Sequence, residues 1–120
     1  MIKVSVPKEC MIIQIGEALE VKTGGFIKAL PHAVIPYKRR DASEKPISRN
    51  SMALFIDPDH ENSLDIPAER SESQLFQCDT TIGLLTPKLK GRWFKGDTYG
   101  DFYLRSLAAY KQPGKNLATQ

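Results

Sequence analysis

The pattern of apolar and polar positions predicts several short strands. Residues 10–15, Cys-Met-Ile-Ile-Gln-Ile, form an uncharged run rich in isoleucine, as is typical of a strand buried on both faces. Residues 26–35 predict another strand, in which Pro31 marks an edge or a bulge. Residues 47–56, with the apolar run Met52–Ile56 at their centre, predict a further strand beyond a polar loop. We expect this strand to pair with residues 26–35 as a long-looped hairpin.

Residues 16–20, Gly-Glu-Ala-Leu-Glu, predict a single helical turn, because Ala, Leu and Glu favour helix. A longer helix is expected near the end of the chain. Phe102, Leu104 and Leu107 recur at helical spacing, and Asp97 or Thr98 can cap the first turn. We therefore expect a helix over residues 98–111, followed by a flexible tail over 113–120. The whole pattern predicts one β-sandwich domain over residues 1–112 with this helix closing it.

Composition excludes several classes of protein. The 120 residues hold 17 Lys and Arg against 14 Asp and Glu, and a net charge of +3 is too small a surplus to indicate a nucleic-acid-binding protein. No apolar run is long enough to span a membrane, and the N-terminus lacks the layout of a signal peptide. Cys10 and Cys78 form neither a metal-binding nor a disulfide pattern. We therefore expect a cytoplasmic protein with free thiols.

Three residues carry the candidate chemistry, and none of them is a catalytic nucleophile or base. His32 follows a glycine-rich turn on one expected strand, and Arg49 and Ser51 share one face of the next. A guanidinium and a hydroxyl directed into an apolar face suit a carboxylate, and an imidazole on the neighbouring strand suits a metal ion. Equally, His32 could be an ordinary strand histidine, and Arg49 could lie in solvent.

The order of short motifs from Val6 to Tyr110 resembles the C-terminal half of the isopenicillin N synthase-like family of Fe(II)- and 2-oxoglutarate-dependent dioxygenases. The motifs are Gln14-Ile15-Gly16-Glu17, Thr23-Gly24-Gly25, His32-Ala33-Val34, Arg49-Asn50-Ser51 with the apolar run to Pro58, Lys90-Gly91-Arg92-Trp93 and Thr98-Tyr99-Gly100-Asp101-Phe102. The resemblance implies a jelly roll, or double-stranded β-helix, or the C-terminal half of one. It implies oxidation of a small organic substrate.

The resemblance also implies roles for individual residues. His32 corresponds to the last iron ligand of the family, and Arg49 and Ser51 to the pair that holds the far carboxylate of 2-oxoglutarate. Ala33 replaces an arginine of the family pattern, and the stretch from His32 to Arg49 is longer than in the family. The His-x-Asp pair that completes the iron site has no counterpart in these residues. We therefore expect the isolated chain to bind Fe(II) weakly and to be inactive unless a partner chain supplies the pair.

A second hypothesis is a non-catalytic β-sandwich that binds a small carboxylate or a partner protein. Exposed sheet edges recruit further strands, so this hypothesis predicts a homo-oligomer. Binding of nucleic acid through the Lys38-Arg39-Arg40 loop is the third alternative, but so short a basic run is more often a solvated loop.

Overall fold

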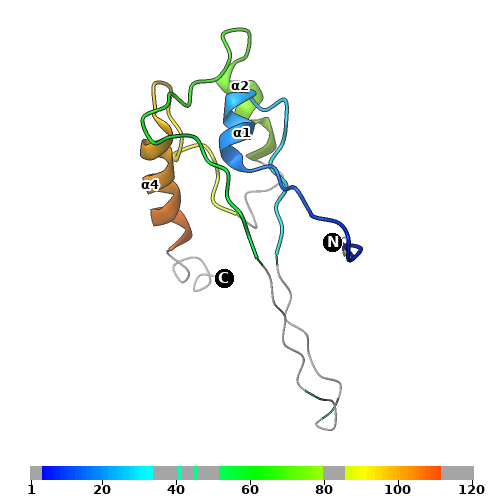
Figure 1. The fold of residues 1–120 in the computed structure, drawn as a ribbon. Helices are drawn as coiled ribbons and strands as arrows, with labels where there is room; N and C mark the ends of the chain where they lie inside the picture. Colours follow the sequence, from blue (N-terminus) through cyan, green and yellow to red (C-terminus); the bar gives the residue numbers. More distant parts are fainter. Residues whose placement is uncertain (1–3, 34–40, 42–44, 46–51, 80–85, 112–120) are drawn as a thin grey trace.

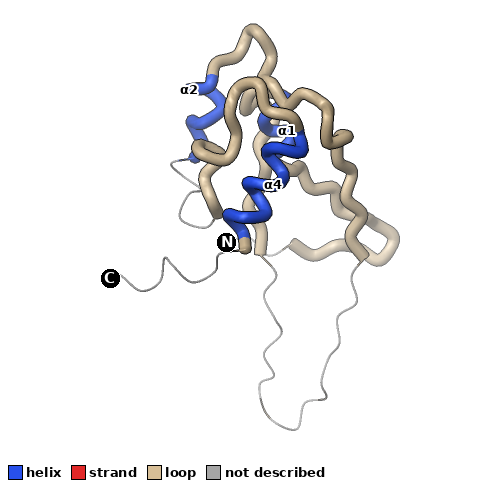
Figure 2. Tube along the Cα trace, turned by 90° about the vertical axis from the view of Figure 1, so that its left-hand side faces the viewer, coloured by secondary structure: helices blue, strands red, loops and turns tan. Residues whose placement is uncertain are grey.

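The computed structural model describes residues 4–33, 41, 45, 52–79 and 86–111 (Figure 1). Four helical elements are present among them: α1 (Glu17–Lys22), α2 (Glu72–Leu75), the 3-10 helix η1 (Phe76–Cys78) and α4 (Tyr99–Tyr110). Loops and extended segments connect them (Figure 2). No helix among these residues is long and apolar enough to cross a lipid bilayer.

The expected β-sandwich or jelly roll is wrong. In the described ranges, β-structure is limited to two isolated bridges, Ser63 with Thr98 and Lys90 with Trp93, and no sheet forms. Residues 10–15 and 52–56 are extended but belong to no ladder. A strand needs a neighbour to take up its backbone hydrogen bonds, and apolar, β-branched composition supplies no such neighbour. The paired hairpin of residues 26–35 and 47–56 is therefore absent from its described portions, 26–33 and 52–56.

The predicted C-terminal helix is confirmed as α4. Thr98 is its N-cap: the Thr98 hydroxyl accepts a hydrogen bond from the backbone N–H of Asp101, and the Asp101 carboxylate accepts one from the backbone N–H of Thr98. This reciprocal pair satisfies two donors that a helix start otherwise leaves open. The helix ends at Tyr110, before Lys111, as the sequence predicts.

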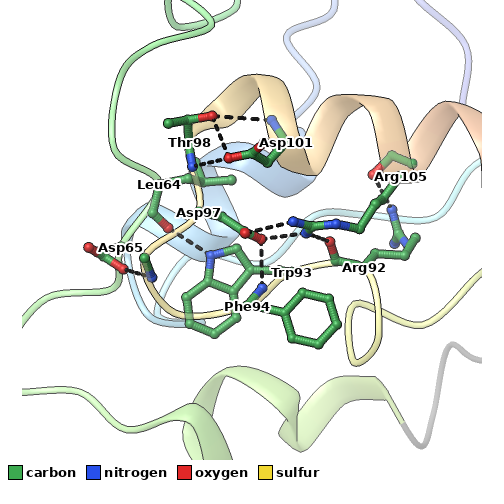
Figure 3. Close-up of polar contacts among 11 residues, drawn as sticks. Leu64, Asp65, Arg92, Trp93, Phe94, Asp97, Thr98, Asp101 and Arg105 are labelled. Carbon is green, nitrogen blue, oxygen red and sulfur yellow. Dashed lines mark hydrogen bonds and ion pairs between the residues drawn. The ribbon is translucent and has the colours of Figure 1, made fainter.

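The core is small and gathers residues from three helices and the loops between them. Trp93 lies at its centre, and its indole N–H donates to the carbonyl of Leu64 at 2.8 Å (Figure 3). Around it pack the buried side chains of Val21, Leu64, Leu75, Leu89, Tyr99 and Phe102. The core therefore fixes α1, α2 and α4 relative to one another.

Candidate functional site: a cavity beside His32

The glycine turn that precedes His32 is built from conformations that only glycine adopts easily. Gly24 has φ of 56° and Gly25 has φ of 76°, both in the left-handed region. A Cβ at Gly24 would lie 2.5 Å from Cβ of Arg70, so a larger residue has no room there. The turn also receives the Arg70 side chain, whose Nε donates to the carbonyl of Gly24 at 3.1 Å. The chain is thereby directed from α1 into residues 26–33.

Glu20 ties α1 to the segment that carries His32. Its side chain is buried, and its Oε2 accepts a hydrogen bond from the backbone N–H of Ala29 at 3.0 Å. Burial raises the pKa of the Glu20 carboxyl above its ordinary value, while the Ala29 N–H and the nearby Lys28 ammonium act against that shift. Ala29 lies three residues before His32, so its contact with Glu20 helps to fix the position of the His32 imidazole.

His32 is exposed, and its ring contacts the backbone of Leu30. The Nδ1 atom lies 3.2 Å from the carbonyl oxygen of Leu30. A carbonyl only accepts hydrogen bonds, so Nδ1 must carry the proton for this bond to form. In the neutral ring Nε2 then holds a lone pair that can bind a cation or accept a proton.

A cavity of about 360 Å³ lies against His32 and is bordered by α1, the segment before His32 and residues 86–89. Its apolar wall includes Ile15, Leu30, Pro31, Pro87 and Leu89. Its polar wall includes the carboxylates of Glu17, Glu20 and Asp79, together with His32, Lys88 and Tyr110. A cavity of this size is at the lower end of the range that small-molecule sites occupy.

The carboxylates of the cavity wall already have partners. Asp79 accepts hydrogen bonds from the backbone N–H groups of Leu89 and Lys90 at 3.0 and 2.9 Å. Glu17 is held by the guanidinium of Arg92, with Nη1 2.8 Å from Oε2. These contacts hold the carboxylates in place, and His32 adds an exposed imidazole at the edge of the same cavity.

Arg92 is a buried guanidinium whose importance the sequence analysis missed. Two of its N–H groups donate to Glu17, one to the hydroxyl of Ser106 and two to the carbonyls of Pro87 and Lys88. All five donors of the side chain are therefore used. Its planar face lies over the rings of Phe102 and Tyr110, with Cζ 5.5 and 5.4 Å from the ring centroids. Arg92 thus connects α1, the loop at residues 87–88 and α4, and it has no N–H group left for an anionic ligand.

A second ion pair, between Arg105 and Asp97, lies beside Trp93 (Figure 3), and neither of its residues lines the cavity. Arg105 donates to the Asp97 carboxylate and, through Nη1, to the carbonyl of Arg92 at 2.7 Å. The Arg105 guanidinium holds the pKa of the Asp97 carboxyl below its ordinary range, with help from the backbone N–H of Phe94. This pair closes the loop before α4.

The residues described do not by themselves fit an iron centre. His32 is one candidate ligand, but no group of three or more His, Cys, Asp or Glu side chains within the described ranges could hold a metal ion. His60 lies elsewhere, with its ring 5.8 and 5.4 Å from the rings of Tyr99 and Tyr103. Arg49 and Ser51, the expected anion clamp, lie outside the described residues.

Comparison of the chain with protein-family models, with curated proteins and with solved structures finds no match.

Proposed function

We propose that this chain supplies one metal-binding imidazole, His32, to a non-haem Fe(II)- and 2-oxoglutarate-dependent oxidoreductase that acts on a small organic substrate. The ordered motifs that resemble the isopenicillin N synthase-like family support the reaction class. No group of three or more His, Cys, Asp or Glu side chains among the described residues could hold a metal ion, so the proposal requires further ligands from outside these residues, and a partner chain is one source of them.

The observation that carries the proposal is the contact between His32 Nδ1 and the carbonyl of Leu30. Histidines that bind metals in proteins usually donate their second ring N–H to a carbonyl or carboxylate, which fixes the tautomer and the direction of the ring. In the exposed His32 the same arrangement leaves Nε2 available at the edge of the cavity.

Arg49 and Ser51 belong to the same proposal. They would bind the far carboxylate of 2-oxoglutarate, or of another small anion, through a bidentate pair and a hydroxyl hydrogen bond. The Arg92 guanidinium is no substitute for this clamp, because its five N–H groups are already bonded.

The proposal predicts weak binding of a divalent metal that depends on His32 and not on His60. We expect anaerobic calorimetry with Mn(II) or Fe(II) to show one weak site, because one imidazole holds these ions poorly in water. His32→Ala should abolish the signal. His60→Ala is the matched control and should leave it unchanged, since that ring lies against Tyr99 and Tyr103.

Two results would overturn this assignment. Tight metal binding that survives His32→Ala would place the metal on other residues. A complete lack of binding, at metal concentrations where free imidazole binds, would show that His32 does not present Nε2 to solvent.

A further inference from the structure

We propose that this chain associates with a second copy of itself by pairing two extended segments: the N-terminal apolar segment (residues 10–15) of one copy and the central apolar segment (residues 52–56) of the other. This inference is independent of the metal assignment, because neither segment contains His32.

Both segments expose large apolar side chains to water. In the central apolar segment, the exposed fractions of Met52, Leu54, Phe55 and Ile56 lie between 81% and 98%. In the N-terminal apolar segment, Met11 is 85% and Ile13 is 82% exposed. Single exposed apolar residues are ordinary on protein surfaces, but consecutive ones mark interaction surfaces.

The backbone of both segments is also open. In the part of the chain that the structure describes, residues 11–15 and 52–56 make no backbone hydrogen bond. An extended apolar segment with unpaired N–H and C=O groups is a template for another strand. Each segment could therefore pair with a second extended, uncharged stretch of chain.

The chain itself provides that stretch. The two segments have six and five residues, which matches the usual length of a strand, and neither contains a charged side chain. Pairing them sets Phe55 against isoleucine side chains, a favourable combination across neighbouring strands. In Figure 1 the N-terminal segment (blue) and residues 52–57 (green) of one copy lie apart from each other.

The pairing joins two different surfaces, so it is heterologous. Each copy then offers both an N-terminal and a central segment, and contacts either close into a ring or continue into an open assembly. Formation of a species larger than the monomer, increasing with protein concentration, is the expected behaviour in solution.

The experiment uses two variants of the full chain and light scattering coupled to size-exclusion chromatography. Ile13→Lys disables the N-terminal segment and Leu54→Lys disables the central one, because a charge inside a strand pair opposes association. Both positions are exposed and lie outside the core, so the fold, checked by circular dichroism, should be unchanged. Leu104→Lys is the matched control, because Leu104 is an exposed leucine on α4.

The heterologous contact makes a distinctive prediction for mixtures. The wild type and Leu104→Lys should form dimers or larger species, while Ile13→Lys and Leu54→Lys should each be monomeric. A mixture of these two monomers should form a one-to-one heterodimer and nothing larger, because it retains one intact segment of each kind. A monomeric wild type, association of either variant alone, or a mixture that stays monomeric would overturn the proposal.

Discussion

At the scale of single residues, buried charge decides which side chains hold this small core together. Glu20 and Arg92 are both buried, but they are satisfied differently. Arg92 has a hydrogen-bond acceptor for every N–H group, including the Glu17 carboxylate. Glu20 has one backbone N–H and an ammonium 3.8 Å away, so its charge is less well compensated. The two residues should therefore respond differently to pH and to substitution.

The buried carboxyl of Glu20 predicts a pH dependence of stability. Its pKa is raised in the folded chain by burial, so the folded state binds this proton more tightly than the unfolded state. The contribution of Glu20 to the free energy of unfolding should therefore fall as the pH rises from its ordinary pKa through the raised value. Glu20→Gln keeps an acceptor for the Ala29 N–H but removes the titration, so the variant should gain stability relative to the wild type across that window. Urea unfolding of both proteins between pH 4 and pH 7 measures the difference in the free energy of unfolding. A lower free energy of unfolding for Glu20→Gln than for the wild type in this range would contradict the raised pKa of Glu20.

At the scale of elements, the helices were more predictable than the extended segments because their signals are local. Thr98, Asp101 and the spacing of Phe102 lie within one short stretch, and the sequence placed α4 correctly. The helix α2 was missed although Ser71 and Gln74 form the same kind of capping box. The expected strands failed because pairing depends on a distant neighbour, which residues 10–15 and 52–56 do not have in the described structure.

The N-cap of α4 gives a prediction at this scale. Thr98→Ala removes the hydroxyl that accepts from the Asp101 N–H, and it should lower the free energy of unfolding by about 1 kcal/mol. Thr98→Ser keeps the hydroxyl and should lose much less. Thermal and urea unfolding, with helix content followed by circular dichroism, distinguish the two. Equal losses in both variants would show that the methyl group of Thr98, not its cap, is what stabilises α4.

At the scale of the whole molecule, long-range contacts decide the site, and these were the least predictable features. The sequence predicted His32 as a candidate metal ligand. It gave no sign that Glu20 binds the backbone before His32 or that Glu17 forms an ion pair with Arg92. Arg92 and Glu17 are 75 positions apart, and no local pattern links them. The alternation argument that placed Arg49 and Ser51 on one face of a strand falls outside the described residues and stays a prediction. Trp93, in contrast, is buried in the core, as a large aromatic residue is in most contexts.

Arg92 joins α1, the loop at residues 87–88 and α4, so its loss should weaken the molecule as a whole. Arg92→Met keeps an unbranched apolar stem but leaves the Glu17 carboxylate and two carbonyls without their donors. Breaking a buried pair from one side costs about 3–5 kcal/mol, a large share of the stability of a domain this size.

Urea unfolding followed by Trp93 fluorescence measures this loss. Arg92→Lys keeps the charge but has three donors in place of five, so it should recover only part of the loss. Lys95→Met is the matched control on an exposed residue and should change the free energy of unfolding by less than about 0.5 kcal/mol. If Arg92→Met unfolds at the same urea concentration as Lys95→Met, the five hydrogen bonds contribute no net stability. The packing of α1 against α4 would then depend on the apolar contacts of Trp93 and Phe102.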